Sequence, residues 1–135
     1  MTRRHSHRLR LHVLVGRFAV CRLEAAASIP PWAEGPGLVS ITRTRDELSV
    51  ICAQDGVPSG TRCENGYAAI AVEGPLDPGL VGVLVALASP LADARIPILA
   101  IGTFDTDYVL VREAHLERAL AVLREAGHDV SPAEK

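Results

Sequence analysis

A repeat within the chain limits the folds it can adopt more than any other feature of the sequence. Residues 37–51 align without a gap with residues 97–111, and each stretch has an apolar segment, a short polar turn and a second apolar segment. This pattern is typical of a β-hairpin. Upstream of the hairpins, residues 18–24 match residues 67–73 as further apolar strands. The chain of 135 residues therefore repeats a strand, a connection and a hairpin.

The connections of the two copies differ, which predicts one complete and one shortened unit. In the second copy, Asp77 is placed to cap a helix and Pro78 to begin it, and apolar residues then recur on one helical face up to Leu91. Pro90 is expected to end or kink this helix near its last turn. In the first copy, the connection over residues 25–36 is proline-rich and allows one turn of helix at most.

The ends of the chain add one strand and one helix to the predicted fold. Residues 9–15 form an extra apolar strand at the front, and a last helix is expected over about residues 114–126. Gly127 is expected to stop that helix in a left-handed conformation, and His128 to act as a cation at its C-terminus.

A strand-helix-strand crossover makes its two strands parallel, and the hairpin adds an antiparallel neighbour. The sequence thus predicts an α+β protein of two ferredoxin-like βαββ units, residues 1–63 and 64–135, with a mixed, mostly antiparallel sheet and helices on one face.

Charge and hydropathy exclude several classes of function. The formal net charge of −2 argues against nucleic-acid binding, and no apolar run reaches the ~18 residues of a membrane helix. The basic segment over residues 3–10 is interpreted as a solvated terminus, with a nucleic-acid or membrane-surface arm as the alternative. We therefore expect a cytoplasmic protein that binds neither nucleic acid nor membranes.

The residue types that usually carry chemistry are scattered. Cys21, Cys52 and Cys63 are odd in number and lack C-x-x-C spacing, so we expect neither a disulfide framework nor a zinc site. Cys21 and Cys52 lie in apolar runs and are expected to be buried, whereas the polar surroundings of Cys63 leave its exposure open. No nucleophile elbow, phosphate-binding loop or zinc-binding helix motif occurs. The sequence predicts no catalytic activity, no metal and no cofactor.

The turn of the second hairpin is the strongest candidate for a binding site. Asp105 and Thr106 are interpreted as ordinary turn residues. Phe104 exposes apolar surface unless something covers it, and Asp107 is poorly suited to begin a strand. The predicted crossover brings this turn to the sheet edge where the helix begins, so backbone N–H groups and a carboxylate would share that edge. Such a pair of subsites is suited to an α-amino acid.

Residues 40–50 and 101–111 also resemble the paired signatures of a family of small bacterial tandem ACT-domain proteins. Relatives include the ACT regulatory modules of aspartate kinases and the animal CASTOR arginine sensors. The resemblance covers nearly the whole chain and implies a regulatory fold that binds amino acids at interfaces between domains or subunits.

The resemblance also implies which residues contact a ligand. Gly102 stands where the family commonly has serine, and the loop after Gly74 differs from the bulkier family version, so the ligand can differ too. The implied ligand contacts are Thr103, Phe104 and Asp107 in the turn, and Asp77, Pro78, Gly79, Leu80 and Val81 in the facing loop.

Three hypotheses about function stay open at this point. The first is a regulatory, non-catalytic protein that binds a small molecule, an amino acid, as a homodimer. The second is a structural or interaction module that forms a homodimer through its sheets and binds no ligand. The third is an enzyme in which the carboxylates of Asp46, Glu47, Asp105 and Asp107 share a cleft, although no nucleophile or metal motif accompanies them.

Overall fold

The structure is a computed structural model that describes residues 7–131, so Arg3 and Arg4 of the basic terminus lie outside the described part. The chain divides into two compact units. One, the split unit, combines the segment up to Leu14 with the segment from Ala69 onward, and the other, the inserted unit, is residues 15–68. Strand β5 (Cys63–Val72) contributes to both. The boundary after residue 63 that the repeat predicts falls at the start of β5 and stays a prediction.

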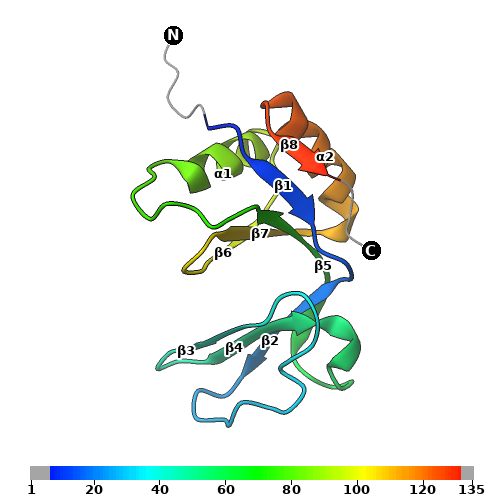
Figure 1. Ribbon diagram of the computed structural model, residues 1–135. Helices are drawn as coiled ribbons and strands as arrows, with labels where there is room; N and C mark the ends of the chain where they lie inside the picture. The colour runs from blue at the N-terminus through cyan, green and yellow to red at the C-terminus, as the bar shows by residue number, and fades with distance from the viewer. Residues whose placement is uncertain (1–6, 132–135) are drawn as a thin grey trace. The chain divides into compact units, whose positions relative to one another are not determined.

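The inserted unit is an antiparallel arrangement of strands in the order β3-β4-β2-β5 (Figure 1). Residues 15–68, all of which the structure describes, form no α-helix, as the short connection predicts. Its buried cluster consists of Ala19, Cys21, Ala33, Leu48, Val50 and Cys52, and Phe18 of the same unit is also fully buried. Its elements are β2 (Phe18–Leu23), β3 (Ser40–Arg43), β4 (Leu48–Ala53) and the 3₁₀ turn η1 (Gln54–Gly56).

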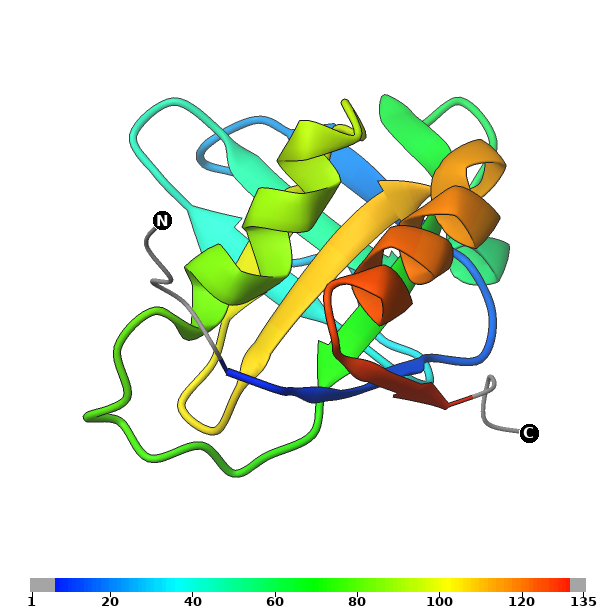
Figure 2. The same cartoon turned by 90° about the horizontal axis from the view of Figure 1, so that it is seen from above.

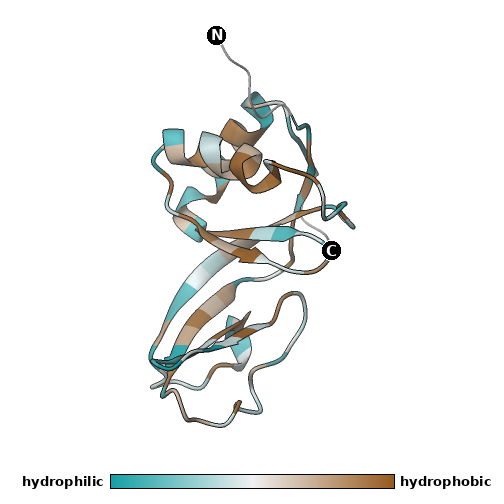
Figure 3. Cartoon of the chain, turned by 90° about the vertical axis from the view of Figure 1, so that its left-hand side faces the viewer, coloured by the Kyte–Doolittle hydropathy of each residue, from teal (hydrophilic) through white to brown (hydrophobic). Residues whose placement is uncertain are grey.

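The split unit carries both helices on one face of its strands (Figures 1 and 2). Strand β1 lies between β8, which is parallel to it, and β5, which is antiparallel, while β7 pairs with both β5 and β6. Hydrophobic stretches lie beside hydrophilic ones along these helices and strands (Figure 3), and the helices bury their apolar sides. Its elements are β1 (Arg10–Val13), α1 (Val83–Asp93), β6 (Leu99–Gly102), β7 (Asp107–Arg112), η2 (Glu113–His115), α2 (Leu116–Glu125) and β8 (Asp129–Ser131).

These features confirm the predicted α+β class with mixed, mostly antiparallel pairing. Gly127 adopts φ of 100°, as predicted for the stop of the last helix. The N–H groups of His128 and Gly127 donate to the carbonyls of Leu123 and Arg124, which completes the hydrogen-bond pattern of a Schellman motif. Among residues 7–131, no helix has the length and apolar character needed to cross a bilayer.

The predicted start of the first helix is wrong. Helix α1 begins at Val83, and Gly82 precedes it in the left-handed conformation with φ of 86°. Asp77 instead closes a local turn, because its Oδ1 accepts the Gly79 N–H at 2.8 Å and its carbonyl accepts the Leu80 N–H at 2.9 Å. Pro78 is therefore a turn residue, and the chain enters the helix only after Gly82, where glycine allows the positive φ.

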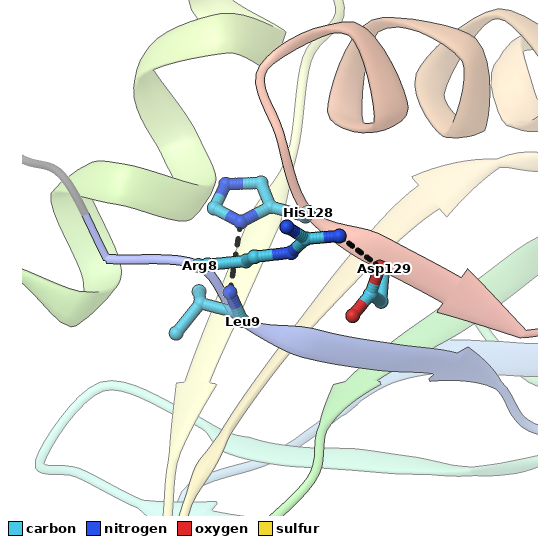
Figure 4. Close-up of polar contacts among 4 residues, drawn as sticks. All are labelled: Arg8, Leu9, His128 and Asp129. Atoms are coloured by element: carbon cyan, nitrogen blue, oxygen red, sulfur yellow. Dashed lines mark hydrogen bonds and ion pairs between the residues drawn. The ribbon is translucent and has the colours of Figure 1, made fainter.

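The buried His128 ties α1 to β1. Pro90 lies inside α1 and has no N–H to donate to the carbonyl of Ala86, four residues earlier. The Nε2 of His128 lies 3.1 Å from that carbonyl oxygen, and its Nδ1 accepts the Leu9 N–H at 3.1 Å (Figure 4). Because Nδ1 accepts, the ring is neutral with its proton on Nε2. The expectation that His128 acts as a cation is therefore wrong.

Strand β8 follows this histidine and was not predicted, because three residues are too few for a periodic pattern. The Asp129 N–H donates to the Leu9 carbonyl at 2.9 Å, and Arg8 donates to Asp129 Oδ1 at 2.9 Å (Figure 4). The hydrogen bond and charge of Arg8 lower the pKa of Asp129. A lowered folded-state pKa means that this exposed pair stabilises the fold above the ordinary carboxyl range, and that the contribution is lost as pH falls through the lowered value.

We expect His128→Ala to lower the free energy of unfolding by about 2–4 kcal/mol, because it leaves a buried N–H and a buried carbonyl without partners. In a Pro90→Ala background the helix regains an N–H for the Ala86 carbonyl, so the same substitution should cost about 1 kcal/mol less. Denaturant unfolding of the four proteins in this cycle measures the difference. An equal cost of His128→Ala in both backgrounds would contradict the assigned bond to Ala86.

Candidate functional site

The β6–β7 turn is closed by the side chain of Thr103. Its hydroxyl donates to the Thr106 carbonyl at 3.0 Å and accepts the Thr106 N–H at 3.2 Å, while the Thr103 N–H donates to the same carbonyl at 2.9 Å. This turn places Asp107 at the start of β7, opposite Gly102. Phe104, at the tip, is 93% exposed.

Two hydrogen bonds fasten this turn to the chain that leaves β5. The Thr106 hydroxyl donates to the Val72 carbonyl at 2.6 Å, and the Leu76 N–H donates to the Asp105 carbonyl at 2.7 Å. A Cβ at Gly74 would lie 3.0 Å from both the Asp105 carbonyl oxygen and the Thr106 Cβ. The interpretation of Asp105 and Thr106 as ordinary turn residues is therefore incomplete, because they also hold the neighbouring loop.

The turn and the loop before α1 enclose a cavity of about 140 Å³. Six of the eight residues that the resemblance implies line it, together with four that it does not imply. Gly79 and Val81 are exposed in the same loop but do not line the cavity. The implied lining residues are Asp77, Pro78, Leu80, Thr103, Phe104 and Asp107, and the additional ones are Leu76, Val83, Asp105 and Thr106.

The charge of the cavity wall is negative. Asp77, Asp105 and Asp107 contribute to it, and no basic side chain lines it among the residues that the structure describes. Opposite these acids, Val83 begins α1, whose N-terminus has no side-chain capping hydrogen bond. The N–H groups of a first helical turn have no partner within the helix. The cavity thus combines carboxylates with the positive end of a helix.

Sequence reasoning missed Val83 because it placed the helix start at Pro78, five residues too early. The close contact between the turn and the loop at Gly74 had one signal in the sequence. Gly74 precedes a proline, and a glycine before a proline often marks a turn or a close backbone approach.

The turn of the first hairpin has the same construction but no acid at the position of Asp107. The Thr44 hydroxyl accepts the Asp46 and Glu47 N–H groups at 3.1 and 3.2 Å, as Thr103 does for Thr106. The matching turns place Leu48 of β4, which is fully buried, at the position of Asp107. The turns therefore match Leu48 to Asp107, whereas the gapless sequence alignment matches Glu47 to Asp107, so the two correspondences differ by one residue.

The four carboxylates that the enzyme hypothesis brings together belong to different units. Asp46 and Glu47 belong to the inserted unit, whereas Asp105 and Asp107 belong to the split unit. Within residues 7–131, no group of three or more histidine, cysteine or acidic side chains is arranged to hold a metal ion.

Comparisons with known proteins place this fold. The family model of the ACT domain matches residues 62–125, and a second model, described as an N-terminal domain, matches residues 16–60. A solved structure of a protein from Agobacterium tumefaciens is 38% identical, with a TM-score of 0.90 and 96% of each chain covered. No curated protein matches the chain significantly.

More distant structures share the fold alone. A Vibrio cholerae protein of unknown function, described as a possible transport protein, is 18% identical with a TM-score of 0.72, covering 88% of this chain and 90% of that one. The regulatory subunit of aspartate kinase from Thermus flavus is 11% identical with a TM-score of 0.59, covering 91% of this chain and 99% of that one.

We expect Gly74→Ala to lower the free energy of unfolding by about 1–3 kcal/mol, because its methyl group would push the loop away from Asp105 and Thr106. Gly79→Ala in the same loop is the matched control, since its nearest contact would be Asp77 Oδ1 at 3.4 Å. We expect that substitution to change stability by less than about 0.5 kcal/mol. Denaturant unfolding measures both, and equal effects of the two substitutions would show that the loop is not fastened to the turn.

Proposed function

We propose that this chain is a regulatory protein without catalytic activity that binds an amino acid. The premise is its family, since the chain belongs to the ACT-domain family of small proteins with two ACT-like units. ACT domains are regulatory modules that generally bind small-molecule ligands such as amino acids. The proposed binding place is the cavity between the β6–β7 turn and the loop before α1.

The observation that carries this proposal is the opposed charge of the cavity walls. The carboxylate of Asp107 is half-buried at the start of β7 and would receive the ligand's ammonium group. Asp77 is less suited to this role, because its Oδ1 already accepts the Gly79 N–H. The first turn of α1, which begins at Val83, would receive the ligand's carboxylate.

The size of the cavity supports a small ligand. Its volume of about 140 Å³ is well below the ~300–1,000 Å³ of pockets for drug-sized molecules. It equals the volume of four or five water molecules at ~30 Å³ each.

Exposed apolar side chains of the β6–β7 turn, the loop before α1 and the first turn of α1 support a homodimer. Phe104 is 93% exposed and Val81 is 82% exposed, and Leu80, Leu84 and Val85 are each more than 40% exposed. Covering such a group with a second copy removes apolar surface from water, at about 25 cal/mol per Å². The same observation favours the second hypothesis, a homodimeric structural module that binds no ligand.

We expect at least one of the twenty common amino acids to raise the midpoint of thermal unfolding at millimolar concentration. A ligand present at 100 times its Kd stabilises the folded state by about 2.7 kcal/mol. Asp107→Asn should abolish this shift, because it removes the charge while keeping the shape of the side chain. Asp46→Asn, in the turn of the other hairpin, is the matched control and should keep it.

Absence of any shift across the panel, or equal loss in both variants, would contradict the proposal. Native mass spectrometry of the same samples separates it from the structural module. A dimer that forms without a ligand and is unchanged by all amino acids supports the structural module instead.

A further inference from the structure

The inserted unit gathers the three cysteines at its core. Cys21 lies on β2, between Cys52 on β4 and Cys63 on β5. Cys21 and Cys52 belong to the buried cluster of this unit, and the half-buried Cys63 packs against it. The three thiols therefore share one face of the sheet, which the sequence spacing did not reveal.

Cys21 and Cys63 are directly opposite each other on neighbouring antiparallel strands. The Arg22 N–H donates to the Arg62 carbonyl at 2.9 Å, so the adjacent pair is hydrogen-bonded and Cys21 faces Cys63 at a non-hydrogen-bonded position. At such positions the Cα atoms are about 4.5 Å apart, and disulfides span about 4.4–6.8 Å. Opposite residues also direct their side chains to the same face of the sheet.

The other two pairings are too wide for a disulfide. Cys52 is opposite Ala19, which makes it a diagonal neighbour of Cys21 at about 7–8 Å. Cys52 and Cys63 are two strands apart, or roughly 9–10 Å. Cysteines whose Cα atoms are more than ~7 Å apart cannot be bridged without backbone movement.

We propose that Cys21 and Cys63 are a redox-active pair that forms a cross-strand disulfide by exchange with a small-molecule disulfide. The Cys63 thiolate attacks one sulfur of the small disulfide, whose S–S bond breaks and releases one thiolate. The Cys21 thiol then loses its proton to solvent or to that thiolate and attacks Cys63 Sγ, which releases the second small thiol. Two protein thiols are oxidised and one small disulfide is reduced to two thiols.

The order of the two cysteines follows from their surroundings. Burial, followed by the charges of Cys63 and Cys52 and a side-chain hydrogen bond with Cys63, raises the pKa of Cys21 to about 12. A buried thiol with a raised pKa reacts poorly with a molecule in solution, whereas Cys63 is partly accessible. Cys63 is thus the residue that meets the oxidant and Cys21 the residue that resolves the adduct.

Glutathione redox buffers of increasing oxidised fraction, applied to the full chain, test this proposal. After alkylation of the remaining thiols and digestion, we expect a peptide that links Cys21 to Cys63 and a Cys52 that is alkylated only after denaturation. Oxidation should raise the midpoint of thermal unfolding, and a reductant should reverse the rise, because the cross-link constrains the unfolded chain.

Two variants make the result specific. Cys52→Ala should form the same cross-link, and Cys21→Ala should instead accumulate a glutathione adduct on Cys63. A stable glutathione adduct on Cys63 of the unmodified chain, a bond to Cys52, or a Cys63 bond between two chains would overturn the proposal. If Cys21→Ala fails to fold, the peptide map of the unmodified chain and of Cys52→Ala still decides it. None of these readouts depends on ligand binding.

Discussion

The hydrogen bonds between the β6–β7 turn and the chain leaving β5 are the constraint on which the candidate site depends. A hairpin turn ordinarily satisfies its own backbone and leaves its side chains in solvent. Here the Thr106 hydroxyl reaches the Val72 carbonyl, and the Asp105 carbonyl takes the Leu76 N–H. Gly74 allows this approach because it has no side chain to place between them. Without these contacts the acidic turn and the loop before α1 would not enclose one cavity.

A second constraint holds the opposite wall of the cavity. Pro90 leaves the Ala86 carbonyl in the first turns of α1 without its helical partner, and the His128 ring satisfies it. The same ring holds the Leu9 N–H, so one neutral side chain joins α1, β1 and the start of β8. A proline that would weaken an isolated helix therefore creates the acceptor that fixes this helix, and Val83, at its start, lines the cavity.

Local patterns in the sequence predicted much of the fold. Both hairpins, the strands before them and the Gly127 stop follow from alternation and turn chemistry, and the structure contains them. The start of α1 did not follow, because Asp77 has the chemistry of a helix cap as well as of a local turn, and only Gly82 decides between them. Strand β8 and the role of His128 depend on contacts far apart in the sequence, which no local pattern contains.

The candidate site was predicted in part for the same reason. Six of the implied residues line one cavity, because the crossover topology brings the turn and the loop to the same edge. Val83 was missed with the start of the helix. The pairing of Cys21 with Cys63 depends on the register of β2 against β5, which a cysteine count does not fix.

The most direct measurement is a two-dimensional amide NMR titration of the ¹⁵N-labelled full chain with the amino acid that stabilises it most. We expect the largest chemical-shift changes at residues 76–83 and 102–107, and we expect these changes to follow one saturating binding curve. Changes centred on residues 44–47 of the other hairpin, or no saturable change in the two predicted segments, would contradict it.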